Sequence, residues 1–259
     1  MNRERKIWLI IAGSVLALFV VYYLVMSVSA VNRTVNDFDN AYFASLEQKE
    51  GDTINLCAIP GYIDMIRDKA FLSSQVKMAE SDSIGLLINV RDSVIQLLIK
   101  GLPVRTVAID DYDVSPFFHR ANQEAIYSML STPLNITGMQ ATFQKDPVSV
   151  KIAPKDTSEV VVSEKPDTTD FEAVFFTLNT DRNIRFFFEQ QEDTVSTDRR
   201  ARFVFDLKDR TRMASATVKS VVRLKTPPYV PYIKIWVPKA EAKIIYRAIP
   251  REGMIVLTQ

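Results

Sequence analysis

Residues 84–109 read IGLLINVRDSVIQLLIKGLPVRTVAI, and this stretch decides the fold that the sequence predicts. It contains short apolar runs, each separated from the next by turn residues, at 84–90, 94–100 and 104–109. The connections are Arg91-Asp92-Ser93 and Gly101-Leu102-Pro103. Apolar runs of this length, bounded by Asp, Ser, Gly and Pro, are typical of a meander of strands. The sequence therefore predicts that an antiparallel β-rich domain begins at Ser83.

Further apolar runs predict strands along the rest of the chain, at Val148–Ile152, Val160–Val162, Ala173–Leu178, Ile184–Phe188, Phe203–Leu207, Val218–Leu224, Ile233–Val237 and Met254–Leu257. Within 202–207 and 219–224, charged residues stand beside apolar ones, as in half-exposed antiparallel strands. Short helices are expected at 122–130, where Asn122 is a candidate cap, and at 238–247.

The N-terminal region contains an uncharged run, Ile7–Met26, that reads IWLIIAGSVLALFVVYYLVM. As a helix it is long enough to cross the ~30 Å hydrocarbon layer of a lipid bilayer. Arg3, Arg5 and Lys6 precede the run, and this basic bias predicts a cytoplasmic N-terminus. We expect an inner (cytoplasmic) membrane protein with the bulk of its chain in the periplasm. A signal peptide cleaved after Ala30 is the alternative.

The segment after the span has an apolar stripe at helical spacing, formed by Val35, Phe38, Tyr42 and Leu46. A second helical pattern follows Pro60-Gly61 and ends near Glu80. The predicted organisation is a cytoplasmic tip with one transmembrane helix (1–30), a helical stalk region (31–82) and a β-rich extracytoplasmic domain (83–259). The fold class expected is thus membrane-anchored and mainly β (α+β).

Composition excludes several kinds of site in this chain of 259 residues with one Cys, one His and 7 Gly. One Cys and one His can form neither a disulfide framework nor a Cys/His zinc cage. A phosphate-binding glycine loop is absent as well. Cys57 has apolar neighbours and His119 follows two Phe, so we expect a small hydrophobe and a packing residue. No catalytic residue, cofactor or metal is predicted, and the carboxylates of 110–113 are interpreted as a solvated turn.

The formal net charge of +1 conceals an asymmetry along the chain. Residues 199–259 contain 14 Lys and Arg against 4 Asp and Glu, whereas residues 31–198 contain 15 against 26. The basic segment predicts contacts with an acidic wall polymer or partner through Arg199, Arg200, Arg202, Arg223, Lys225, Tyr232 and Lys234. The alternative is that basic strands pair with acidic ones inside one sheet. Nucleic acid is not expected as a partner, because the predicted topology places the basic segment on the opposite side of the membrane.

Two segments resemble the L,D-transpeptidase (YkuD-like) domain. Leu86–Gly101 is similar to its opening hairpin, and Ile233–Leu257 is similar to its closing strand, short helix with a Tyr, Gly and final strand. In that family a Ser-His-Gly-Cys run precedes the strand that matches Ile233–Ile235, but here the residues are Tyr229-Val230-Pro231-Tyr232. The nucleophile position falls on Tyr232 and the His position on Val230. The resemblance therefore implies a relative without catalytic activity.

These observations favour a non-catalytic, single-pass cell-envelope protein whose periplasmic domain is a binding or scaffold module, with peptidoglycan as a candidate ligand. The first alternative is a structural subunit, in an oligomer or a multiprotein envelope machine for secretion, motility or division. A third is an envelope enzyme that uses Cys57 or an unrecognised carboxylate pair.

Overall fold

The computed structural model describes residues 3–47, 60–143, 145, 173–191, 196–223 and 225–259. Within these ranges the chain has an α+β fold with a nine-strand mixed sheet and six helices. It forms two compact units. The helical unit comprises residues 1–73, 114–132 and 206–232, and the sheet unit comprises residues 74–113, 133–205 and 233–259.

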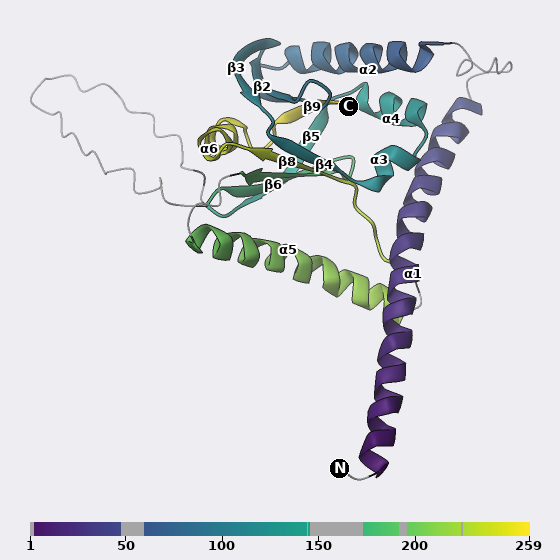
Figure 1. Cartoon of the computed structure of the whole chain (residues 1–259). Helices are drawn as coiled ribbons and strands as arrows, with labels where there is room; N and C mark the ends of the chain where they lie inside the picture. Colours follow the sequence, from purple (N-terminus) through teal and green to yellow (C-terminus); the bar gives the residue numbers. More distant parts are fainter. Residues whose placement is uncertain (1–2, 48–59, 144, 146–172, 192–195, 224) are drawn as a thin grey trace, which may run out of the picture. The chain divides into compact units, whose positions relative to one another are not determined.

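The sheet has the strand order β3-β2-β1-β9-β5-β6-β7-β8-β4 (Figure 1). Its strands are β1 (Ile84–Asn89), β2 (Val94–Ile99), β3 (Leu102–Ala108), β4 (Asp111–Val114), β5 (Leu134–Ala141), β6 (Phe175–Thr180), β7 (Arg185–Gln190), β8 (Tyr232–Val237) and β9 (Met254–Thr258). The predicted meander β1–β3 is confirmed, as are the strands near β6, β7, β8 and β9. The expected strands at 148–152 and 160–162 lie outside the described residues.

The expectation of an antiparallel sheet is wrong in part, because the sheet is mixed. β1 and β9 are parallel, with Gly85 beside Met254 and Asn89 beside Thr258. Leu86, Ile88 and Ile255 are fully buried, as expected for strands covered on both faces. Central strands of this kind carry no alternation of polar and apolar residues, so their sequences do not indicate the direction of pairing.

The largest correction concerns residues 196–222. The strands expected at 203–207 and 218–224 are wrong, because this region forms one helix, α5 (Ser196–Val222). Its sequence contains no Gly or Pro that would interrupt a helix. At its start the buried Asp198 carboxylate accepts a hydrogen bond of 3.1 Å from the Gln190 amide. The Lys239 ammonium lies 3.5 Å from the same carboxylate and compensates its charge.

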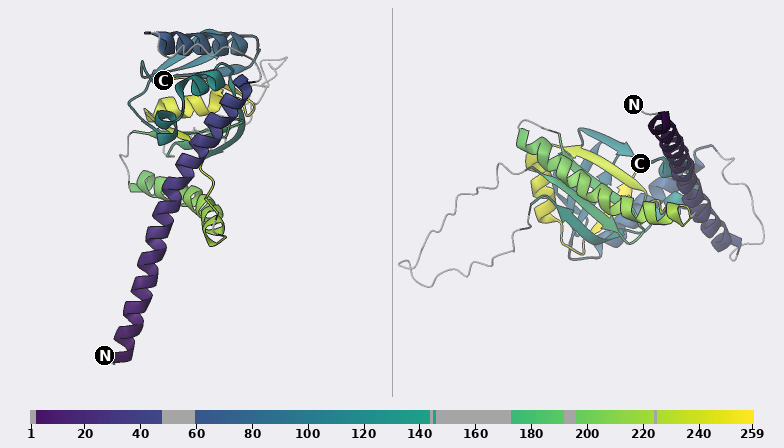
Figure 2. Two further views of the ribbon diagram at one scale, coloured as in Figure 1. Left: turned by 90° about the vertical axis from the view of Figure 1, so that its right-hand side faces the viewer. Right: turned by 90° about the horizontal axis from the view of Figure 1, so that it is seen from below.

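The other helices are α1 (Arg3–Glu47), α2 (Tyr62–Ala79), α3 (Pro116–Arg120), α4 (Gln123–Leu130) and α6 (Lys239–Ala248). Figure 1 and Figure 2 show α1 as one unbroken rod, which confirms the helix expected after the apolar run. Over the residues that the structure describes, no helix is long and apolar enough to cross a membrane. The expected span, 7–26, falls in part on residues whose side chains lie outside that description.

In the helical unit, α1 packs against α3 and α4. The rings of Phe38 and Phe117 meet edge to face with centroids 5.2 Å apart. Asp39 accepts a hydrogen bond of 2.9 Å from the backbone N–H of Asn122. The predicted cap of α4 is confirmed, because the Asn122 side chain accepts hydrogen bonds from two N–H groups of the first turn. His119 is exposed on α3, so the prediction that it packs in a core is wrong; Phe117 and Phe118 are the buried residues.

In the sheet unit, aromatic rings pack between α6 and the strands beneath it. Phe176 on β6 stacks on Phe188 of β7 with ring centroids 4.5 Å apart. Tyr246 of α6 lies 5.1 Å from Phe176 and 4.8 Å from Phe143, centroid to centroid. Phe176 and Phe188 are buried almost completely. These rings fix α6 on the sheet and place Tyr246 beside β5.

An ion pair between β3 and α6 predicts how stability depends on pH. The Arg105 guanidinium donates hydrogen bonds of 2.8 and 2.7 Å to the Glu241 carboxylate. These bonds, with the attraction between the charges, hold the pKa of Glu241 below its ordinary value. In the unfolded chain a Glu has a pKa of about 4.3, so the pair stabilises the fold above that pH. Its contribution is lost as the pH falls through the lower pKa of the folded protein.

We therefore expect Glu241→Gln to lower stability at neutral pH and to flatten the loss of stability in acid. Urea unfolding between neutral and acidic pH measures both effects. Arg105→Gln should remove the same acid-dependent difference. An unchanged slope in Glu241→Gln would show that the pair does not contribute.

Candidate functional site: a basic pocket beside β5

The basic residues predicted from the sequence are distributed over both units. In the sheet unit, Arg199 and Arg200 are exposed on α5. Arg202 is half-buried and its guanidinium lies 2.5 Å from the Glu189 carboxylate. The Lys234 ammonium on β8 lies 5.8 Å from the centroid of the Phe187 ring. Arg202 thus pairs with an acidic residue of its own chain, but from a helix and not from the basic strand of the sheet that the alternative interpretation expected.

The remaining predicted contacts belong to the helical unit. Arg223 and Lys225 are exposed beyond α5. The backbone of Tyr232, at the start of β8, exchanges hydrogen bonds with Ser115: its carbonyl accepts from the Ser115 N–H, and its N–H donates to the Ser115 hydroxyl. The predicted residues are thus divided between the two units. Contact of any of them with an acidic partner stays a prediction.

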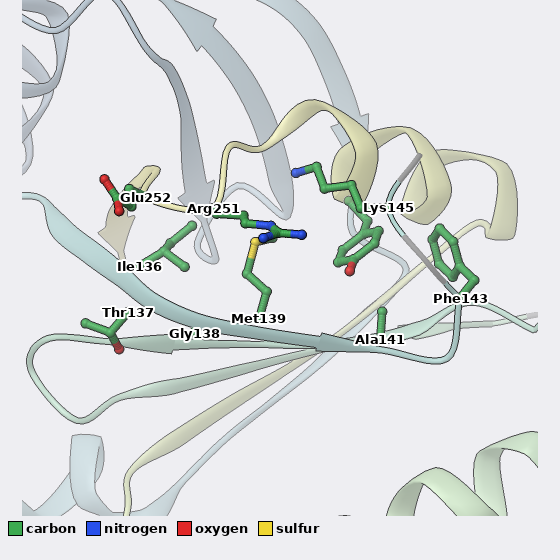
Figure 3. Close-up of a pocket in the computed structure, with 10 residues that line it drawn as sticks. Ile136, Thr137, Gly138, Met139, Ala141, Phe143, Lys145, Arg251 and Glu252 are labelled. Atoms are coloured by element: carbon green, nitrogen blue, oxygen red, sulfur yellow. The ribbon is translucent and has the colours of Figure 1, made fainter. Parts of the chain in front are cut away.

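The sheet unit contains a pocket that the sequence did not predict. Its cavity volume is about 760 Å³, within the range of ligand sites. Residues of β5, of the segment that follows it, of α6 and of the α6–β9 loop line it (Figure 3), namely Ile136, Thr137, Gly138, Met139, Ala141, Phe143, Lys145, Tyr246, Arg251 and Glu252. Four consecutive residues of β5 take part. Figure 3 shows the side chains of Met139 and Ala141 on the same side of β5 as Lys145 and Arg251, so the pocket lies over one face of the strand. Because the intervening residues of β5 line it as well, and side chains alternate between faces, the pocket also reaches the edge of the strand.

The pocket exists because β5 and β9 separate. They pair only at Leu134 with Ile255 and at Asn135 with Met254, and the N–H of Ile136 makes one further hydrogen bond, to the Gly253 carbonyl. Beyond that point β5 continues beside β6 alone, after a bulge between Ile136 and Gly138. Glycine inside a strand often marks such a bulge.

A tight turn carries the chain away from β5 on the other side of the pocket. The N–H of Gly253 donates a 3.2 Å hydrogen bond to the Pro250 carbonyl, which closes the turn. A Cβ at Gly253 would lie 3.1 Å from that carbonyl oxygen, so glycine fits here best. The turn presents Arg251 and Glu252, both exposed, at the mouth of the pocket.

Two cations face the interior of the pocket. In Figure 3, the side chains of Lys145 and Arg251 reach into the same space above Met139. The Lys145 ammonium donates a hydrogen bond to the Ile249 carbonyl and lies 5.6 Å from the centroid of the Tyr246 ring. Burial and, secondarily, the charge of Arg251 lower the pKa of Lys145. An anion between the two side chains would relieve both effects.

Tyr246 adds a neutral hydrogen-bonding group to the lining. Burial raises the pKa of its phenol, and the Arg251 charge opposes that change only in part. The phenol is therefore protonated at neutral pH and can donate a hydrogen bond. Together with Lys145 and Arg251, it makes the pocket suited to a carboxylate or another small anion at the end of an otherwise apolar ligand.

The lining contains neither Cys nor His. Cys57 lies outside the described residues. Throughout the ranges that the structure describes, no group of three or more His, Cys, Asp or Glu side chains could hold a metal ion. The chemistry that this geometry supports is the binding of an anion.

Sequence reasoning missed this pocket because it missed β5. Asn135, Thr137 and Gly138 interrupt the apolar residues of that strand, so no run was visible. The glycine among β-branched residues was the one available signal. A glycine can be interpreted as a bulge only once the strand around it is known.

No family model, curated protein or solved structure matches this chain. The fold and the pocket define it as an α+β protein with a basic pocket at a strand edge. The resemblance to L,D-transpeptidases stays a prediction.

Proposed function

We propose that this chain is a non-catalytic, single-pass cell-envelope protein whose periplasmic β-rich domain is a binding or scaffold module. The pocket beside β5 would hold a carboxylate of the bound partner. The observation that carries this proposal is the convergence of Lys145 and Arg251 on one cavity whose other lining residues are mostly apolar. Peptidoglycan, whose peptides carry free carboxylates, is the first partner to test.

The membrane anchor in this proposal rests on residues 7–26. They carry no charge, and basic residues precede them. Several large apolar side chains of α1 are exposed between residues 18 and 28: Leu18, Val20, Val21, Tyr23, Leu24, Val25 and Val28. A bilayer around this part of α1 would remove these side chains from water, which is favourable at about 25 cal/mol per Å² of apolar surface.

The absence of catalysis in this proposal rests on the positions that the resemblance assigns. Tyr232 and Val230 would stand where a transpeptidase has its thiol and imidazole. His119 is on α3 in the helical unit, whereas the pocket belongs to the sheet unit. An envelope enzyme that uses Cys57 remains the third hypothesis, and full function of a Cys57→Ala, His119→Ala double variant would eliminate it.

A structural subunit of a multiprotein envelope machine is the second candidate. One observation favours it: Phe203 and Val204 are adjacent on α5 and are 65% and 61% exposed. Large apolar side chains exposed together are typical of surfaces that contact another subunit. A stable large assembly of the detergent-extracted chain in size-exclusion chromatography would support this candidate over the first.

Co-sedimentation of the full chain, in detergent, with purified cell-wall sacculi tests the first candidate. We expect binding at low salt that weakens as salt rises, because ions screen exposed charges beyond about 10 Å at 0.1 M. Arg251→Gln should weaken binding about tenfold, as expected for the loss of one charge-assisted hydrogen bond.

The matched control is Arg91→Gln, which removes the same charge from an exposed turn outside the pocket. It should leave binding unchanged. Absence of binding at low salt would refute wall binding. Equal losses of binding in the two variants would show that the net charge of the chain attracts it to the wall and that the pocket is not a specific site.

A further inference from the structure

We propose that the pocket recognises the C-terminus of a protein chain, which would bind as an added strand along the edge of β5 that no described strand covers beyond Asn135. The inference rests on the carboxylate-binding function proposed above and specifies the partner: an extended segment of L-amino acids that ends in a free carboxylate. Three features support it: the backbone groups of β5 that face away from β6, the turn that precedes β9, and the positions of Lys145 and Arg251.

The first step concerns the backbone groups of β5. The N–H of Thr142 donates a hydrogen bond of 2.9 Å to the Phe175 carbonyl at the end of the β5–β6 ladder. Hydrogen-bonding directions alternate along a strand, so Met139 and Ala141 turn their N–H and C=O groups away from β6. That direction lies in the plane of the sheet, on the side from which β9 has departed, while the side chains of both residues line the pocket from one face of β5 (Figure 3). In the described part of the chain no strand pairs with β5 on this side beyond Asn135.

The second step concerns the position that a partner strand would take. β9 is antiparallel to β5, so extending the register beyond Asn135 and Met254 would place earlier residues of the chain beside Gly138 to Ala141. The turn closed by Pro250 and Gly253 instead takes the chain away. Among the described residues the place of the next stretch of strand, about 4.8 Å from β5, is therefore left open beside the pocket.

The third step concerns the direction of the added strand and its charge. A peptide that continues the line of β9, antiparallel to β5, would have its C-terminus nearest the turn that carries Arg251. Its carboxylate would then meet the guanidinium of Arg251 and the ammonium of Lys145, which point into the same space (Figure 3). Glu252 is exposed beside Arg251 and disfavours an acidic residue at the mouth.

The fourth step concerns length and side chains. The edge from Gly138 to Ala141 matches about four residues of extended peptide at about 3.3 Å per residue. The pocket wall contributed by Ile136, Phe143 and Tyr246 is apolar or aromatic. Apolar, β-branched residues just before the carboxylate fit this wall and favour the extended conformation. Strand addition of this kind obtains affinity from main-chain hydrogen bonds and specificity from alternate side chains.

The test measures binding of short peptides to the full chain in detergent by fluorescence anisotropy. The probe is fluorescein-Thr-Val-Thr-Val with a free C-terminus. One control peptide has a C-terminal amide. Another has N-methyl groups on both Val residues, which removes backbone donors and keeps the charge. We expect the free acid to bind and each control to lose about tenfold or more, because each lacks hydrogen bonds that the edge or the cations provide.

Two variants of the chain test the same geometry from the protein side. Met139→Pro removes an N–H that points away from β6, toward the added strand, and leaves the β6 ladder intact, because proline is tolerated at such edge positions. It should abolish binding of the free acid, whereas Met139→Leu should retain it. Arg251→Gln should weaken the free acid about tenfold and leave the amide unaffected, with Arg91→Gln as the unchanged control.

Equal binding of the N-methylated and unmodified peptides would overturn strand addition, and this result does not depend on any variant folding. Absence of binding by all peptides would overturn it as well. The sacculus assay separates this failure from failure of the proposed function. If sacculi bind the native chain and Met139→Pro equally but do not bind Arg251→Gln, the result would support the proposed carboxylate site and refute the addition of a strand.

Discussion

Phe176→Ala is expected to lower the free energy of unfolding by about 3–5 kcal/mol, the usual cost of removing a buried aromatic ring. Phe176 is fully buried on β6 and contacts two further rings, those of Phe188 and Tyr246. Truncation would leave a cavity under α6 that the rigid sheet cannot fill. Urea unfolding followed by the fluorescence of Trp236, on β8 of the same unit, measures the effect.

Phe203→Ala is the matched control, because it makes the same chemical change at a side chain that is 65% exposed. It should change the free energy of unfolding by less than about 0.5 kcal/mol. Losses of similar size in the two variants would mean that α6 and the sheet are not packed as described. Tyr246 also lines the pocket, so Phe176→Ala should weaken ligand binding even in the fraction that remains folded.

Gly85→Ala is expected to destabilise the protein by about 1–3 kcal/mol through overpacking. A Cβ at Gly85 would lie 2.2 Å from Sδ and 2.8 Å from Cγ of Met78, closer than atoms can approach. Met78 is 2% exposed and has little room to move aside. The predicted loss is measured by the same urea titration.

A double-mutant cycle with Met78→Ala tests the physical cause. Met78→Ala alone leaves a cavity, and the added methyl at Gly85 fills part of it. The double variant should therefore be more stable than the sum of the two single changes predicts, by about 0.5–3 kcal/mol. Additive losses would show that the contact with Met78 is not the cause of the destabilisation.

The sequence predicted elements whose signal is local. The β1–β3 meander has turn residues at each connection, and α4 has Asn122 as its cap, so both were predicted. The segment from β8 through α6 to β9 was predicted for the same reason.

The errors concern features that depend on contacts between distant residues. α5 was assigned to strands because apolar and charged residues alternate locally in it. Its helical form is stabilised by pairs such as Arg202 with Glu189, which the local pattern does not contain. The pocket was missed because it requires a bulge in β5 and a turn that is distant from β5 in the sequence.

The parallel pairing of β1 with β9 determines when this sheet can be completed. Gly85 and Met254 are neighbours in space although 169 positions separate them in the chain. Until β9 is inserted, β1 and β5 both present open edges, and open edges of apolar strands promote aggregation. Sheets closed by such distant pairings form slowly. Until β9 is in place, the edges of β1 and β5 are therefore the parts of this sheet most open to pairing with another chain.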